Sequence, residues 1–254
     1  LRSLDAAATL DLARSFVAGK IRNARHVVLR GARESRSEED AASLTRTAQN
    51  LAAALRALPN AVTLDILRGL EGEAAKQYFA TLPRLVKSDL RESFSMDGRS
   101  RRPPRDRFNA LLSFLYSMWM NDCRSALESV GLDPQVGFLH ALRPGRAALA
   151  LDLMEEFRPF ADRLALTLVN RQQLVASDFL FREGGGVSLA DDARKRVIVA
   201  YQERKQDTLQ HPLLAEPMAL GLVPLVQARL LARAVRSETD SDGSSASYVP
   251  FLIK

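Results

Sequence analysis

The sequence has little of what disulfide-bonded, zinc-binding and β-rich proteins need. A single cysteine, Cys123, means that neither a disulfide nor a cysteine-based zinc site can form within the chain. Glycine occurs 13 times and proline 11 times in 254 residues, which is too few for a sandwich or barrel with many tight turns. The longest stretch without a charge, 108–121, is too short to span a bilayer, and the first residues lack the apolar core of a signal peptide. We therefore expect a protein of the reducing cytoplasm.

Residues that favour helices dominate what is present. Leucine, alanine and arginine are the prevailing types, while 46% apolar and 26% charged residues make an ordinary globular composition. This composition predicts an all-α fold of roughly eight helices. The excess of 36 Lys and Arg over 30 Asp and Glu leaves a net charge of +6, which suits a polyanionic partner without proving one.

Apolar residues at helical spacing and capping residues give the predicted order of elements. We expect Ser37, Asn60 and Asp106 to cap the helices that follow them. Only the passage 184–189 has strand or turn character. The predicted domains are a helical domain, 1–236, and a low-complexity linker with an apolar tail, 237–254. The helices are expected at about 4–33, 38–58, 61–82, 107–130, 146–158, 159–169, 194–208 and 219–235.

Two segments could carry chemistry. His140 precedes a predicted helix on which Asp152 and Glu155, three residues apart, share one face. Two carboxylates with an imidazole are a plausible half-site for a divalent metal, although exposed acidic pairs on helices are common. In the other segment Glu71 lies between Gly69 and Gly72, and two glycines inside a helix call for a compensating close approach of a helix or a phosphate backbone. The alternative there is a tight helix pair with Glu71 merely exposed.

These segments together resemble a known family. The passages Gly-Leu-Glu-Gly at 69–72, Gly-Phe-Leu-His at 137–140 and Leu-Asp-Leu-Met-Glu-Glu-Phe-Arg-Pro at 151–159 are similar to motifs of the integrase of CRISPR adaptation, CRISPR-associated protein one. The resemblance covers nearly all of the chain, in family order. Further similar stretches lie at 16–23, 106–116, 185–187 and 193–195.

The resemblance implies a fold, a reaction and a site. That family carries a β-rich domain before its helical catalytic domain, so this chain, which starts without Met, is expected to begin at the helical domain. The family joins 3′-hydroxyl ends of captured DNA to phosphodiesters of a CRISPR repeat. Its metal ligands fall on Glu71, His140 and Glu155, which suits Mn²⁺ or Mg²⁺, and Asp152 is expected to act nearby on a second metal, a water or a ligand. In some relatives the ligand at Glu155 is an aspartate.

The implied partners are DNA, a second copy of the chain, a small ferredoxin-fold CRISPR-associated adaptor and, in some relatives, an iron–sulfur nuclease. An arginine-rich loop around two prolines is expected to contact the DNA backbone. We expect the apolar tail at 248–253 to dock on a partner or another subunit. A non-catalytic DNA-binding module and a purely structural scaffold remain the competing hypotheses. The arginines expected on DNA are Arg99, Arg101, Arg102, Arg105, Arg107 and Arg146.

Overall fold

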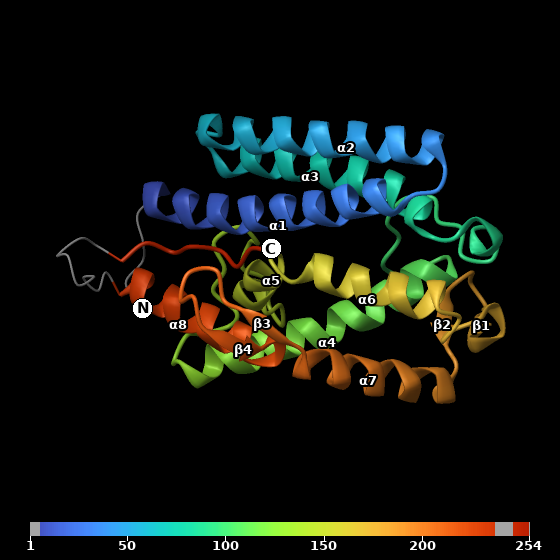
Figure 1. Cartoon of the computed structure of the whole chain (residues 1–254). Helices are drawn as coiled ribbons and strands as arrows, with labels where there is room; N and C mark the ends of the chain where they lie inside the picture. Colours follow the sequence, from blue (N-terminus) through green and yellow to red (C-terminus); the bar gives the residue numbers. More distant parts are fainter. Residues whose placement is uncertain (1–5, 237–245, 254) are drawn as a thin grey trace.

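Helices make up most of the part of the chain that this computed structural model describes, residues 6–236 and 246–253 (Figure 1). Eight α-helices and two short antiparallel hairpins occur there, which confirms the predicted all-α class. The hairpins are β1 (Phe179–Phe181) with β2 (Val187–Leu189) and β3 (Thr208–Gln210) with β4 (Pro217–Ala219). The helices are α1 (Ala6–Glu34), α2 (Glu38–Ala57), α3 (Leu64–Thr81), α4 (Arg107–Ser129), α5 (Ala148–Met154), α6 (Arg158–Asn170), α7 (Asp191–Gln206) and α8 (Val223–Val235).

Side-chain caps set the starts of three helices. Ser37 accepts a hydrogen bond from the Asp40 amide at the start of α2, and Asp106 accepts one from Asn109 at the start of α4, as expected. The cap expected at Asn60 is wrong. Asn60 ends a short 3₁₀ turn that contains Pro59, and Thr63 instead accepts a hydrogen bond from the Ile66 amide to open α3.

Of the two hairpins, only the first was anticipated. The β1–β2 pair, with Phe179 opposite Leu189, encloses the glycines of the passage expected to form a turn. The β3–β4 pair was missed because it consists of two three-residue strands with no alternating apolar pattern.

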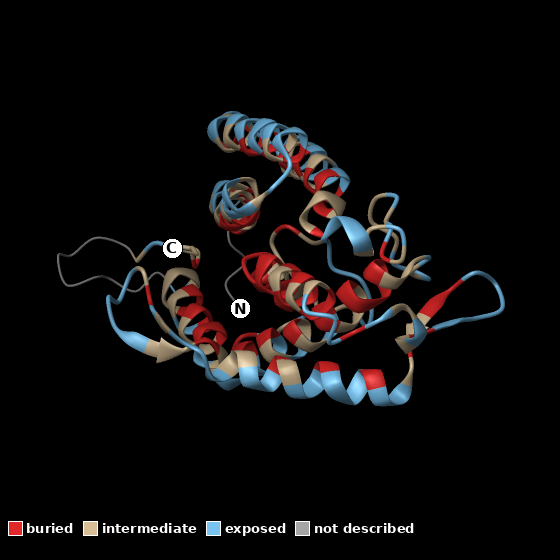
Figure 2. Ribbon diagram, turned by 45° about the vertical axis from the view of Figure 1, so that its right-hand side comes forward, coloured by how far each residue is buried: buried red, intermediate tan, exposed pale blue. Residues whose placement is uncertain are grey.

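The helices form two layers. Helices α1, α2 and α3 pack on one another, while α4 is the centre of a second group that includes α5, α6 and α8 (Figure 1). Contacts of α1 with α5 and α6 join the two groups. Figure 2 shows the buried residues on the facing sides of these helices and the exposed ones on the outer sides. The candidate site residues lie where the two layers meet.

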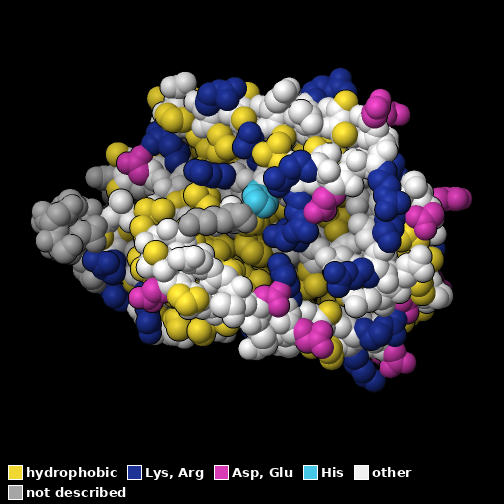
Figure 3. Space-filling model, in the orientation of Figure 1, with side chains coloured by type: hydrophobic (Ala, Val, Ile, Leu, Met, Phe, Trp, Pro, Cys, Tyr) yellow, Lys and Arg dark blue, Asp and Glu magenta, His cyan; other side chains and the backbone are white. Residues whose placement is uncertain are grey.

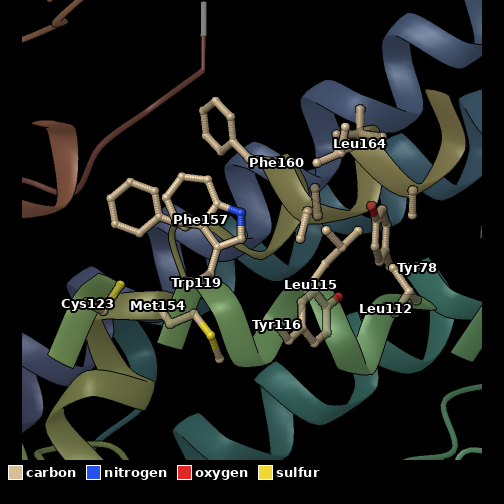
Figure 4. Packing of buried hydrophobic residues seen from close by; sticks show 14 of the residues in the cluster. Tyr78, Leu112, Leu115, Tyr116, Trp119, Cys123, Met154, Phe157, Phe160 and Leu164 are labelled. Atoms are coloured by element: carbon tan, nitrogen blue, oxygen red, sulfur yellow. The ribbon is translucent and has the colours of Figure 1, made fainter. Parts of the chain in front are cut away.

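Large aromatic side chains fill the core of the second layer (Figure 4). Trp119 of α4 stacks on Phe157, which precedes α6, with ring centres 5.1 Å apart and planes only 9° apart. Cys123 lies in the same cluster with none of its surface exposed, and burial raises the pKa of its thiol. Inert packing, as the sequence suggested, is therefore its role.

The expectation that the apolar tail docks on a partner is wrong for its described residues. Phe251 is buried against Phe157 and Phe160, and the tail runs alongside α1 (Figure 1). The Phe251 amide donates to the buried Glu156 carboxyl, and Asn23 of α1 bonds both the Phe251 carbonyl and the Ile253 amide. The tail docks on its own chain because it supplies the partners that these buried polar groups require. The linker expected at 237–245 lies outside the described residues.

Candidate functional site

An open cavity of about 720 Å³ lies between the two layers of helices. It brings together Glu71, His140 and Glu155, which are far apart in the sequence. Apart from these two glutamates, every charged residue in its lining is basic. The basic residues are Lys20, Arg68, Lys76, Arg99, Arg101, Arg143, Arg146 and Arg158.

Glu155 lies at the junction of α5 and α6, where the sequence predicted one continuous helix, 146–158. The helix ends at Met154, and α6 starts at Arg158 with a proline in its first turn. The Glu155 side chain is 3% exposed, and its Oε2 atom lies 2.9 Å from Arg158 Nε and 2.7 Å from Lys20 Nζ. Burial raises its pKa, but Arg158, Lys20 and His140 outweigh burial and hold the pKa at about 2. Glu155 is therefore a buried carboxylate at neutral pH.

His140 is oriented by Asp152, both of whose carboxylate oxygens contact the loop that carries His140. Oδ1 of Asp152 accepts hydrogen bonds from the His140 amide, at 3.0 Å, and contacts ring atom Nδ1 at 2.6 Å. Oδ2 accepts from the amides of Phe138 and Leu139. Both oxygens of Asp152 therefore hold the His140 loop, while its expected action on a second metal, a water or a ligand stays a prediction. The ring is held so that Nε2 lies 4.0 Å from Glu155 Oε1.

Asp152 and Glu155 diverge although their spacing predicted a shared face. Asp152 belongs to α5, whereas Glu155 follows the end of that helix. A carboxylate at 152 therefore bonds the preceding loop, and the one at 155 enters the cavity. Gly137 permits the loop to come this close, since an added Cβ would lie 2.9 Å from both the Ala148 backbone and Asp152 Oδ2.

Glu71 lies on α3, and two contacts connect this helix to the rest of the site, one made by Arg68 and one by Glu71 itself. Arg68, one turn earlier on α3, donates to the Leu139 carbonyl at 2.7 and 3.0 Å and so ties the His140 loop to this helix. Lys20 of α1 forms an ion pair with Glu71 as well as with Glu155. Neither Lys20 nor Arg68 was identified from the sequence, because a basic residue on a helix gives no signal of its partner.

Of the two close approaches that the sequence left open at Gly69 and Gly72, a helix or a phosphate backbone, the helix is wrong. A Cβ added at either position would meet no atom within 4 Å. Gly72 instead lines the cavity beside Glu71. Open space, rather than another helix, lies against this stretch of α3.

The arginine-rich loop divides into anchored and exposed residues. Arg99 donates to Asn109 Oδ1 at 2.8 Å and to Ser113 Oγ at 3.0 Å, and lies over the Tyr116 ring. Arg107 donates to the carbonyls of Ser93 and Ala176 and lies over the Phe181 ring. These two arginines therefore hold the loop in place. The loop arginines whose side chains remain exposed are Arg101, Arg102 and Arg105.

Basic residues also gather across the mouth of the cavity. Arg146, partly buried, lines it, and its pKa is lowered first by burial and then by the neighbouring charges of Arg143 and Arg102. Figure 3 shows one face of the whole molecule, on which Lys and Arg side chains outnumber Asp and Glu. Such a concentration of like charge attracts a polyanion.

A ready-made metal cluster is not found within residues 6–236 and 246–253, where no three His, Cys, Asp or Glu side chains are grouped closely enough to hold an ion. The ammonium of Lys20 lies between the two glutamates and takes the position that a shared cation would need. The described helices also include none that is long and apolar enough to cross a membrane.

Comparison with known proteins assigns the family. Residues 1–203 match the family model described as CRISPR associated protein Cas1. The chain is 55% identical over 251 residues to a CRISPR-associated endonuclease Cas1 of Moorella thermoacetica, covering 98% of this chain and 71% of that protein. It is 39% identical to part of a Cas4 exonuclease/Cas1 endonuclease fusion of Geobacter sulfurreducens, covering 93% of this chain and 42% of the fusion.

A solved structure agrees with this assignment. The partial Cas6-RT-Cas1–Cas2 complex contains a similar chain, with a TM-score of 0.80 and 26% identity, covering 98% of this chain and 70% of that one. The motifs around Glu71, His140 and Glu155 therefore lie in a fold and a sequence that both agree with the resemblance first seen in the residues. The chain belongs to the Cas1 family of CRISPR-associated proteins.

Proposed function

We propose that this chain is a divalent-metal-dependent DNA endonuclease and integrase that inserts captured DNA as new spacers into a CRISPR array. The observation that carries the proposal is the cavity in which Glu71, Glu155 and His140 Nε2 meet while the rest of the charged lining is basic. In the reaction, a 3′-hydroxyl of the captured fragment attacks a repeat phosphodiester and displaces a 3′-oxygen, so one phosphodiester forms as another breaks.

The residues present fit Mn²⁺ or Mg²⁺. Two carboxylates and one imidazole nitrogen form an oxygen-rich set, the type that these ions prefer. Oε2 of Glu155 is buried and contacts the two cations Lys20 and Arg158, so this oxygen already lies where positive charge is bound. Glu71, His140 and Glu155 would hold the ion. When bound, it would supply a Lewis acid that lowers the pKa of the attacking hydroxyl and neutralises phosphate charge.

The chain's own residues supply positioning and charge. Phosphoryl transfer depends mainly on in-line placement and on stabilising the negative charge of the phosphate. Asp152 keeps Nε2 of His140 turned toward Glu155, and Arg68 keeps the His140 loop against α3. The exposed Arg101 and Arg102, together with Arg143 and Arg146 at the cavity, would bind the phosphate backbone without reading sequence.

The assembly proposed for this chain follows its relatives. Association with the small adaptor is supported by the complex of a similar chain with Cas2, and the homodimer is proposed on the family resemblance alone. Association or fusion with an iron–sulfur nuclease is supported by the Geobacter protein, in which a Cas4 exonuclease and a Cas1 endonuclease share one polypeptide. We place the reaction in the cytoplasm, where a CRISPR array is accessible.

A strand-joining assay tests the proposed function. Glu71→Gln, His140→Ala and Glu155→Gln should each reduce the joining rate in Mn²⁺ or Mg²⁺ by more than the roughly 10- to 100-fold typical of losing a residue that only orients a ligand. DNA binding should persist, because the arginines are unchanged. Glu73→Gln, an exposed neighbour on α3, is the matched control and should join strands normally.

The same assay separates the competing hypotheses. Wild-type protein that binds DNA without joining strands would identify a non-catalytic DNA-binding module. Protein that does neither would identify a structural scaffold. Near wild-type joining by any of the three site variants would refute the site assignment.

A further inference from the structure

Among the residues that the structure describes, Lys20 is the one that forms ion pairs with both glutamates of the site. It projects from α1, its side chain is 15% exposed, and its ammonium forms ion pairs with Glu71 and with Glu155, the latter at 2.7 Å. The two carboxylates therefore lie within two hydrogen-bond lengths of each other. Like charges this close and this shielded from water require a cation between them.

The other basic residue at Glu155 is held differently. The Arg158 guanidinium lies over the Tyr116 ring, 4.7 Å from its centre, and is buried beside Glu155. A planar group fixed by a ring on one side and a carboxylate on the other cannot leave without breaking both contacts. The Lys20 ammonium is instead a point charge on a flexible stem, and it borders the open cavity of about 720 Å³. Both cations line this cavity, but Lys20 is the one whose ammonium contacts Glu71 as well as Glu155 and whose contacts involve no ring.

Charge balance then predicts competition. Glu71 and Glu155 are neutralised by Lys20 and Arg158 as the site stands. A divalent ion that enters between the glutamates would use the same oxygens as the Lys20 ammonium and would be repelled by it. The ion can take this position only if Lys20 gives up its two carboxylate contacts.

We propose that Lys20 is a built-in counter-cation that holds Glu71 and Glu155 together before metal binding and is exchanged for the metal ion. The inference rests on the proposed function, since it concerns the metal of that site. Lys20 acts as a positioning residue, because its charge offsets the repulsion between the two carboxylates and keeps them close. It also lowers the affinity of the site for the metal ion, because it occupies the same oxygens. The cost of displacing Lys20 is subtracted from the free energy of metal binding.

Manganese affinity tests the exchange, measured by electron paramagnetic resonance of the free ion with no DNA present. Lys20→Met removes the charge and keeps the stem, and should lower the Kd for Mn²⁺ about tenfold or more, equivalent to about 1.4 kcal/mol. Lys76→Met is the matched control. Lys76 lines the same cavity but is exposed on α3, so its Kd should stay within about threefold of wild type at physiological salt.

Failure of this inference and failure of the proposed function give different results. Equal Kd values for wild type and Lys20→Met, or equal tightening by Lys20→Met and Lys76→Met, would overturn the role of Lys20 and leave the metal site in place. Glu71→Gln should weaken binding. If neither wild type nor Lys20→Met binds Mn²⁺, the metal site is refuted and the exchange with it.

A second measurement on wild-type protein covers the case in which Lys20→Met does not fold. Acetylation by acetic anhydride, read by peptide mass spectrometry, should increase at Lys20 when Mg²⁺ is added, because the ion frees the amine from the carboxylates. Acetylation of Lys76 should stay constant. A decrease or no change at Lys20 in saturating Mg²⁺ would refute the exchange.

Discussion

Removing the Phe251 side chain should destabilise the helical domain itself. Phe251 is 2% exposed, and its ring centre lies 5.6 Å from Phe160, 6.1 Å from Phe157 and 5.5 Å from His211. Truncating a buried phenylalanine to alanine costs about 3–5 kcal/mol in well-packed cores. We expect the lower end, about 3 kcal/mol, because a segment outside any helix or strand can relax into the space more readily than a helix.

The magnitude has a second source in the hydrogen bonds of the tail. Undocking would leave the Glu156 carboxyl without the Phe251 amide and the Asn23 side chain without its tail partners, and each unsatisfied buried group costs about 1–3 kcal/mol. Detaching the tail therefore costs more free energy than keeping it docked with the smaller alanine side chain.

Urea denaturation followed by circular dichroism measures the effect. For Phe251→Ala we expect a loss of about 3 kcal/mol at an unchanged m value, or a fall in melting temperature of about 6–12 °C. Val249→Ala is the control, since Val249 is 37% exposed, and should change stability by less than about 0.5 kcal/mol. A loss below about 1 kcal/mol for Phe251→Ala, with assembly impaired, would refute docking on the same chain and restore the partner-docking hypothesis.

Two further predictions concern charge. The double variant Arg101→Ala, Arg102→Ala should weaken binding to unrelated DNA sequences alike and reduce the slope of log binding constant against log salt concentration by about one per lost phosphate contact. An unchanged slope would count against this assignment. Arg107→Ala should instead lower stability, because its guanidinium donates to the carbonyls of Ser93 and Ala176. Burial raises the pKa of Asp162 from 3.8 to about 6, so the folded chain binds more protons than the unfolded one in that range and the free energy of unfolding should fall as pH rises through it, by at most about 1.4 kcal/mol per pH unit. Asp162→Asn should flatten that fall in urea titrations at several pH values, and an identical pH profile for wild type and variant would contradict it.

Several sequence patterns left more than one structural outcome open. The two glycines beside Glu71 left open a close approach by a helix or by a phosphate backbone, and the structure has no helix against them. Arg99 and Arg107 were expected on DNA; the structure shows donors of both bonding Asn109 and Ser93 within the chain, and their contact with DNA stays a prediction. An arginine in the sequence does not show whether its guanidinium faces solvent or donates to a backbone carbonyl, so composition alone cannot distinguish a DNA-binding arginine from a structural one.

The sequence by itself determined the helices, most of their limits and the family. Periodic apolar residues and the caps Ser37 and Asp106 act locally, within one turn of the residues concerned, so they can be read without the fold. Only the tertiary structure decided what meets across the two layers. The contact of Lys20 with Glu71 and Glu155, and the docking of Phe251 on Phe157, join residues about 50 to 135 positions apart, and such pairings depend on how the layers pack, which no local pattern encodes.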